Sequence, residues 1–355
     1  MPPHRASTSV RRSATTRCSV AARRFATGLR ARLGRAVVAA YLLALFLPGP
    51  GLWLRSPHAP AHGPAVHATP VLLGVVLFAA GYKFPLAALS PLLARPRPLL
   101  AALALHAALP LALIPLVALL LRAGSDQDHG SGITTALILI VTMPVASGAT
   151  VWATKDTADQ PTIVAAVLLT TLSSPLTTPL VTGLLAPLVE GPHTRTLQVA
   201  GAAAGGGFAL GAIVLPCLLG TAARTLLATA AAERLGILVE PVALVASLLT
   251  TYANASGALG ACLQRPRPLL LCAAVATAAL LCAASFLLGR LASTALRLDH
   301  PTRSSLTLIS GMNNSSAGAA LLTAAAPDKP HLLMPVLAYG LLQKTAANLA
   351  LRGAR

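Results

Sequence analysis

Long apolar segments separated by short polar stretches dominate this sequence and restrict what it can fold into. A helix needs about 20 consecutive apolar residues to cross a bilayer core of about 30 Å. Inside a bilayer the backbone must satisfy its own hydrogen bonds, so we expect every such segment to be helical. The sequence therefore predicts an all-α, polytopic membrane protein of about ten transmembrane helices. The ten segments are residues 36–54, 70–91, 98–122, 133–154, 162–188, 197–222, 237–261, 268–292, 304–325 and 332–351.

The amino-acid composition favours the same fold class. Hydrophobic residues make up 55% of the 355 residues and charged residues only 10%, whereas soluble domains contain about 25% charged residues. Despite a net charge of +18, the Lys and Arg residues are not interleaved with aromatics, and most lie between apolar segments. This distribution is typical of membrane orientation rather than nucleic-acid binding. The partner it predicts is the lipid bilayer, with no nucleic acid and no obligate protein partner.

Motifs of cofactor and catalytic sites do not occur in the sequence. The five cysteines form no CxxC pair and no cluster with histidines, and neither an HExxH motif nor a glycine-rich phosphate loop is present. The nine acidic residues, of which Asp126 is the first, lie in loops or at the ends of apolar segments. We therefore expect no cofactor and no enzymatic activity. An integral membrane enzyme and a regulatory membrane component are the alternatives from other functional classes.

The first 35 residues form a region of their own. Nine of the 27 basic residues are arginines in this stretch, which contains no acid. We interpret residues 1–35 as a basic, disordered leader, followed by a transmembrane domain at residues 36–351 and a tail at 352–355. An organelle transit peptide has a similar composition and is the alternative.

The distribution of Lys and Arg between the apolar segments predicts the orientation of the chain. The connections on the N-terminal side of the membrane, the segment ends that adjoin them and the C-terminal tail hold eleven of these residues, and the connections and adjoining ends on the other side hold six. Because basic loops stay in the cytoplasm, both termini are predicted to be cytoplasmic. The expected location is the inner (plasma) membrane, or a plastid or other organelle envelope if residues 1–35 are a transit peptide.

A repeated string of residues relates the two halves of the chain. Arg-Pro-Arg-Pro-Leu-Leu occurs at Arg95–Leu100 and again at Arg265–Leu270. Five apolar segments lie between the copies, and because five is odd, the copies face opposite sides of the membrane. The sequence therefore predicts two inverted five-helix repeats, an architecture that many secondary transporters share.

Two polar, glycine-containing stretches interrupt apolar segments at corresponding places in these repeats. They are Pro144–Thr150 and Gly311–Ser316. Pro144 removes a backbone hydrogen bond, and the glycines permit local unwinding. Interrupted segments in matching positions mark the binding site of a secondary transporter. The predicted substrate-binding residues are Ser147, Gly148, Thr150, Asn313, Asn314 and Ser315.

Lys344 is an ionisable residue within the apolar segment 332–351. Charged residues inside membrane segments are usually functional, which makes Lys344 a candidate ion-coupling residue. It lies only about two helical turns from the end of the segment, so its ammonium group can also reach the interface. The two interpretations stay open.

The residues around both breaks resemble the bile acid:sodium symporter family. Pro144–Pro179 is similar to the fourth and fifth spans of that family, and Gly311–Ala320 to its ninth, which reads glycine, methionine, glutamine, asparagine, serine. Leu72–Arg97 resembles its second span and the basic loop that follows. The resemblance implies a panel of spans one, two, six and seven beside a core of spans three to five and eight to ten. It also implies that broken spans four and nine cross where sodium and an organic anion bind.

Several positions depart from the sodium-binding pattern of that family. Alkyl side chains stand at Ala149, Ile163, Val167 and Ile309, where the family has oxygen ligands. One sodium site therefore looks dismantled, because an alkyl group cannot replace the hydration shell of a hard cation. The resemblance leaves one sodium site, formed by Ser310, Met312 and Asn313, or a proton carried by His106, which lies beside a glutamine position of the family. The predicted ion-coupling residues are Ser310, Met312, Asn313, His106 and Lys344.

These observations together predict a secondary active transporter of an organic anion. It would be coupled to sodium or protons and would work by alternating access at the crossing of two broken helices. An arsenite permease of related architecture is the alternative carrier, although Met143 stands here in place of the fourth-span cysteine of such permeases.

Overall fold

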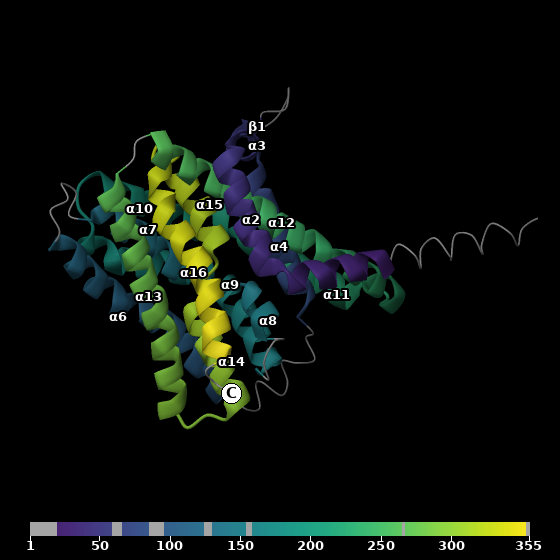
Figure 1. Ribbon diagram of the computed structural model, residues 1–355. Coiled ribbons are helices and arrows are strands. Elements are labelled where there is room, and N and C mark those ends of the chain that lie inside the picture. Colours follow the sequence, from purple (N-terminus) through teal and green to yellow (C-terminus); the bar gives the residue numbers. More distant parts are fainter. Residues whose placement is uncertain are drawn as a thin grey trace, which may run out of the picture.

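The computed structural model describes residues 20–58, 66–84, 96–123, 130–153, 158–264 and 267–352 (Figure 1). These residues are almost entirely helical, which confirms the predicted all-α fold class. Regular structure of another kind is limited, among the described residues, to one antiparallel pair of two-residue strands, β1 (Pro57–His58) and β2 (Val66–His67). Most of the predicted leader and parts of both Arg-Pro-Arg-Pro strings lie outside the described residues.

Residues 20–31, which the sequence assigns to the leader, are helical. Ala26 is buried, and Arg30 forms an ion pair with Glu240. These contacts attach the end of the leader to the helices that follow, which explains why this part of it is ordered.

The first half of the chain follows the predicted segments closely. Its first apolar segment is split at Leu47 into two helices bent by 95°, because Pro48 begins the second helix and has no backbone N–H to continue the first. The hydroxyl of Tyr252 donates a hydrogen bond to the carbonyl of Leu47 and stabilises this bend. The helices are α2 (Leu33–Phe46), α3 (Pro48–Arg55), α4 (Ala68–Tyr82), α6 (Arg97–Arg122), α7 (Ser131–Val141), α8 (Gly148–Ala153), α9 (Gln160–Leu185) and the short η2 (Ala186–Leu188).

The second half begins with a segment that is interrupted at Gly206, where the backbone is extended. Its helices are α10 (Pro192–Gly205), the π-helix η3 (Ala209–Val214), α11 (Leu215–Leu226), α12 (Thr229–Gln264), α13 (Pro268–Ala295), α14 (His300–Gly311), α15 (Ser315–Ala325), the 3₁₀ turn η4 (Pro330–Leu332) and α16 (Leu333–Arg352).

By length and composition, five stretches among the described residues can cross a membrane: α6, α9 with η2, η3 with α11, α12 and α13. The bent pair of α2 and α3 is a sixth. The predicted total of ten also counts α4, α16 and the two broken segments, so that number stays a prediction.

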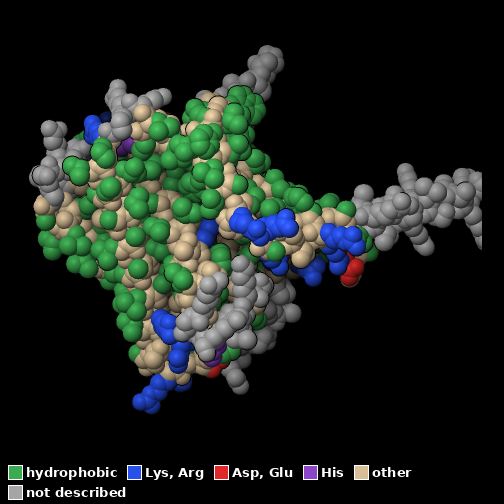
Figure 2. Space-filling model, viewed as in Figure 1, with side chains coloured by type: hydrophobic (Ala, Val, Ile, Leu, Met, Phe, Trp, Pro, Cys, Tyr) green, Lys and Arg blue, Asp and Glu red, His purple; other side chains and the backbone are tan. Residues whose placement is uncertain are grey.

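The surface of the long helices is apolar, as a lipid-facing surface must be. On α9, Leu176, Leu180 and Leu184 recur every fourth residue and are 72%, 59% and 59% exposed. Figure 2 shows hydrophobic side chains over most of the visible helical face, with Lys and Arg gathered toward the N-terminal helix and the lower end. Such continuous apolar exposure is found where lipid, rather than water, surrounds a protein.

The helices form two groups. In one, α4 packs against α11 and α12, and α12 also packs against α2 and α3. In the other, α13 packs against α14 and α16, and α9 packs against α6 and α10. Figure 1 shows α2, α4, α11 and α12 together beside the remaining helices.

The sixth predicted span divides between these two groups. Its first part, α10, packs against α9 and α15, whereas α11 packs against α4. Glycines on α10 permit the close approach: a Cβ on Gly201 would lie 2.9 Å from the Thr182 hydroxyl, and one on Gly205 would lie 3.3 Å from the Pro175 carbonyl. Small residues let membrane helices pack backbone to backbone. The resemblance implied that the whole sixth span belongs to the panel. In the structure its first part, α10, packs against α9 and α15 instead.

Candidate functional site

The two predicted breaks meet in the structure. Val145, between α7 and α8, pairs with Asn313, between α14 and α15, as an isolated antiparallel bridge. The N–H of Ala146 donates to the carbonyl of Met312 at 2.8 Å, and the N–H of Asn314 donates to the carbonyl of Pro144 at 2.9 Å. Each break therefore satisfies backbone groups that the other has released, which is the condition for non-helical backbone at membrane depth. The prediction of broken, crossing fourth and ninth spans is confirmed.

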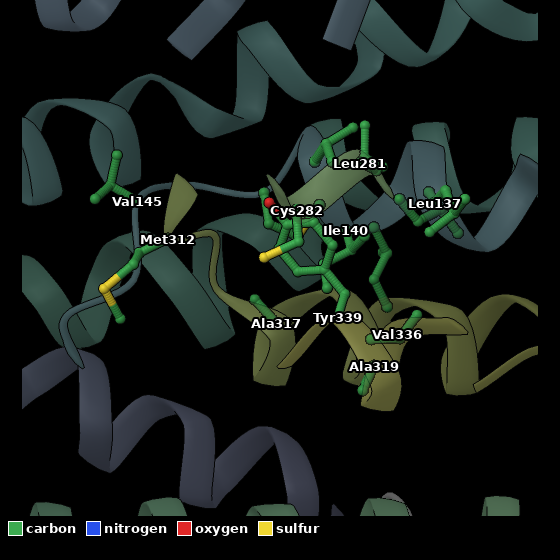
Figure 3. Packing of buried hydrophobic residues seen from close by; sticks show 14 of the residues in the cluster. Leu137, Ile140, Val145, Leu281, Cys282, Met312, Ala317, Ala319, Val336 and Tyr339 are labelled. Atoms are coloured by element: carbon green, nitrogen blue, oxygen red, sulfur yellow. The ribbon is translucent and has the colours of Figure 1, made fainter. Parts of the chain in front are cut away.

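Close packing at Gly311 keeps the second break in place. A Cβ on this residue would lie 2.2 Å from the ring of Phe286 on α13. No side chain larger than hydrogen fits there without displacing the ring. Figure 3 shows the packing next to the crossing, with Val145 and Met312 at the breaks and Tyr339 near Cys282.

Helix α9 supports the first break with two threonines. The hydroxyl of Thr170 accepts a hydrogen bond from the N–H of Val145 at 3.1 Å, and the hydroxyl of Thr178 donates to the carbonyl of Thr142 at 3.0 Å. These bonds pair backbone groups that Pro144 leaves without helical partners.

Helix α16 supports the second break with Tyr339 and Gln343. The Gln343 Oε1 atom accepts from the N–H of Asn313 at 2.9 Å. The Tyr339 hydroxyl accepts from Asn313 Nδ2 at 3.0 Å and donates to the Gly311 carbonyl at 3.2 Å. Neither residue is among the candidates predicted from the sequence. The sequence does contain a signal that could have identified them. Two polar side chains lie four residues apart in an apolar segment, and this spacing places both on one face of the helix.

The structure separates the predicted substrate-binding residues. Ser147, Gly148 and Thr150 line a cavity of about 90 Å³ between α8 and α9 on one side and α4 and α12 on the other. Asn314 caps α15, since its Oδ1 accepts from the N–H of Ala317 at 3.1 Å. Ser315 lies 3.5 Å from Gln343 Nε2. The backbones of the two breaks meet, but the polar side chains of the second break do not line the cavity beside Ser147.

Asn313 and Ser310 instead line a narrow space inside the second group of helices, together with His106 of α6. Asn313 is 3% exposed, and its Oδ1 atom has no hydrogen-bond partner among the described residues. The Ser310 hydroxyl donates to the Leu306 carbonyl at 2.7 Å, and His106 interacts with the backbone of Met143. Lys344 lies half-buried on α16 and lines neither this space nor the cavity beside Ser147.

Two oxygen atoms at the predicted sodium site already take part in hydrogen bonds, and each has at least one lone pair left for a cation. The carbonyl of Met312 accepts from Ala146, and the hydroxyl of Ser310 donates to the backbone of its own helix. The Oδ1 atom of Asn313 has no hydrogen-bond partner among the described residues and is free to accept. The positions that depart from the family pattern are buried in the apolar core: Ala149, Ile163 and Ile309 at 0% exposed and Val167 at 3%.

Comparison with known protein families agrees with this geometry. The family model of the sodium bile acid symporter family matches residues 70–265, which is more than half of the chain. The protein belongs to this family. The resemblance inferred from the residues around the breaks is therefore confirmed, and the chain is a multi-pass membrane protein of a transporter family. No curated protein shows a significant match to the chain.

The matched residues include the first break but end before the second. The string Gly311–Ser316 lies outside the matched residues, so its resemblance to the family's ninth span stays a prediction. In the structure this string pairs with the first break, which lies within the matched residues.

Proposed function

We propose that this protein is a secondary active transporter of an organic anion that works by alternating access. The observation that carries the proposal is the cavity beside Ser147. It lies between α4 and α12 of one helix group and α8 and α9 of the other. A ligand bound there contacts both groups, so a relative movement of the groups can open the cavity first to one side of the membrane and then to the other.

The crossing of the two breaks supports this assignment. The bridge between Val145 and Asn313, with the bonds from Thr170, Tyr339 and Gln343, connects α7, α8, α9, α14, α15 and α16. These helices form the core of the proposed mechanism and move as one unit. Helices α2, α3, α4, α11 and α12 form the panel, against which the core moves.

The residues around the crossing support coupling to one sodium ion at most, or to protons. A second sodium ion would need oxygen ligands where Ala149, Ile163, Val167 and Ile309 present buried alkyl groups. Asn313 Oδ1 is the acceptor that remains for a single cation, with the neighbouring backbone carbonyls as additional ligands. Ser310 and Met312 complete this proposed sodium site, and His106 beside it is the residue that would carry a proton.

The proposed location is the inner (plasma) membrane with both termini in the cytoplasm. In this orientation the cavity beside Ser147 lies nearer to the cytoplasmic side, because it is also lined by Leu33 at the start of α2 and by Lys83 directly after α4. The surrounding partner is the lipid bilayer.

Uptake into proteoliposomes tests the proposal. The purified protein is reconstituted, and uptake of organic anions is measured with a sodium gradient, a proton gradient and neither gradient. Accumulation of an anion that depends on one of the gradients is expected. Accumulation of arsenite alone would indicate the arsenite permease alternative, and failure of every tested anion and of arsenite would contradict a transport function.

A further inference from the structure

The cavity beside Ser147 carries an excess positive charge on its panel side. Two ionisable residues that line it are Lys83, which directly follows α4, and Glu240 on α12. Arg30 forms an ion pair with Glu240, so the acid is already neutralised by a residue outside the cavity lining. Lys83 has no ion-pair partner within the described part of the chain. Among the described residues, Lys83 is therefore an ammonium group that lines the cavity without an ion-pair partner.

Hydroxyl groups from both helix groups lie around the same space. Ser147, at the first break, and Ser247, on α12, line the cavity with Lys83. Neither side-chain hydroxyl has a hydrogen-bond partner among the described residues, whereas the Thr150 hydroxyl donates to the carbonyl of Ser147 at 2.8 Å. Two free hydroxyl donors and one ammonium group suit an anionic group such as a carboxylate.

The remaining wall is apolar and the volume is small. Side chains such as Val76, Val164 and Leu244 enclose a cavity of about 90 Å³. Pockets for drug-sized ligands measure about 300–1,000 Å³, so a steroid-sized amphipath does not fit this conformation. The cavity has room for a short carboxylate with a small apolar body.

From these observations we propose that Lys83 is the charge-recognition residue of the transporter and that its substrates are small monocarboxylates. This inference rests on the proposed transport function and specifies its substrate class. Lys83 and Ser247 belong to the panel and Ser147 to the core, so the bound carboxylate joins the two groups that move. The bound anion thereby connects the panel to the core, and this connection couples anion binding to the relative movement of the two groups.

Uptake kinetics of reconstituted variants test this role. The probes are radiolabelled glycolate, lactate and 2-oxobutanoate, with cholate as the large anion. Lys83→Gln is expected to raise the KM for the short carboxylates about tenfold or more, because a charge-assisted hydrogen bond is lost. Lys83→Arg is expected to keep the KM within about threefold of the wild-type value. Arg35→Gln is the matched control, since it removes one positive charge from an exposed residue near the start of α2, outside the cavity.

The possible outcomes separate the role of Lys83 from the substrate class and from the transport function. A wild-type KM in Lys83→Gln, with lactate uptake intact, overturns the role of Lys83 but leaves the transport function standing. Uptake of cholate without uptake of the short carboxylates overturns the substrate class. Failure of all four anions in the wild type also overturns the substrate class, whereas the transport function itself is decided by the gradient experiment with other anions and arsenite.

A measurement on the wild-type protein keeps the inference falsifiable if the neutral variant fails to insert. Lactamide has nearly the shape of lactate but no charge. It is expected to inhibit uptake of labelled lactate at least tenfold more weakly than unlabelled lactate does. Equal inhibition by the two compounds overturns charge recognition.

Discussion

Val145 and Asn313 pair across the two helix breaks as an antiparallel bridge, although they lie in opposite halves of the chain. Two hydrogen bonds flank this bridge, one from Ala146 to Met312 and one from Asn314 to Pro144. Through this bridge and its flanking bonds, backbone N–H and C=O groups of the two breaks are hydrogen-bonded to each other. Its position explains why variants at the breaks should fall into two kinds, those that affect the fold and those that affect transport.

Gly311→Ala and Gly148→Ala separate these two kinds. The Cβ added at residue 311 would lie 2.2 Å from the Phe286 ring, whereas the one added at residue 148 would have Met312 Cε, at 3.9 Å, as its nearest neighbour. We expect Gly311→Ala to lower the yield of folded protein strongly, because overpacking of a tight site is destabilising. Gly148→Ala should insert normally but transport more slowly, since its methyl group faces the cavity. Size-exclusion profiles and uptake rates check both expectations, and normal folding of Gly311→Ala would contradict the packing described.

Tyr339→Phe should weaken the second break without changing its shape. The hydroxyl that is lost accepts from Asn313 Nδ2 and donates to the Gly311 carbonyl, so two buried polar groups are left unpaired. The expected loss of stability is about 1–3 kcal/mol, measured as a lower thermal midpoint in detergent. Tyr41→Phe is a suitable comparison, because its hydroxyl makes one partly buried bond, to the Leu337 carbonyl. An equal or smaller loss for Tyr339→Phe would argue against the network around Asn313.

Ser147→Ala and Ser310→Ala test which serine takes part in transport. The Ser147 hydroxyl faces the cavity and is free among the described residues, so its removal should raise the KM for the substrate about three- to tenfold. The Ser310 hydroxyl bonds back to the Leu306 carbonyl of its own helix. Ser310→Ala should therefore leave the KM for the anion nearly unchanged. Any sodium dependence should persist in Ser310→Ala, because the proposed sodium site uses the backbone at Ser310. A loss of sodium dependence would show that the hydroxyl oxygen is the cation ligand.

Dependence of the initial uptake rate on sodium concentration should be hyperbolic or absent. Buried alkyl side chains at Ile163, Val167 and Ile309 leave no ligands for a second sodium ion. The measurement is made at fixed pH and membrane potential. A sigmoidal dependence with a Hill coefficient near two would mean that two sodium ions bind and that their ligands lie elsewhere. Asn313→Ala should abolish any sodium dependence that is found.

Most of the fold was predictable from the sequence, because a membrane leaves few alternatives for an apolar chain. The long apolar segments, the proline and glycines at the breaks and the motif of the ninth span each depend on local residue order. They predicted the helices, the two interruptions and the family. The physical reason is that lipid cannot satisfy backbone hydrogen bonds, so apolar length alone specifies helices and their interruptions mark special sites.

The direction of the polar side chains was decided only by the tertiary structure. The sequence could not indicate that the Asn313 side chain bonds to Tyr339, or that Ser147 lines a cavity together with Lys83, because these arrangements join residues from different helices. Nor could it show that α10 packs against α9 and α11 against α4. Which face of a helix meets which neighbour depends on packing among all the helices together. Sequence therefore determined the helices and the location of their breaks, and packing determined which groups face the cavity.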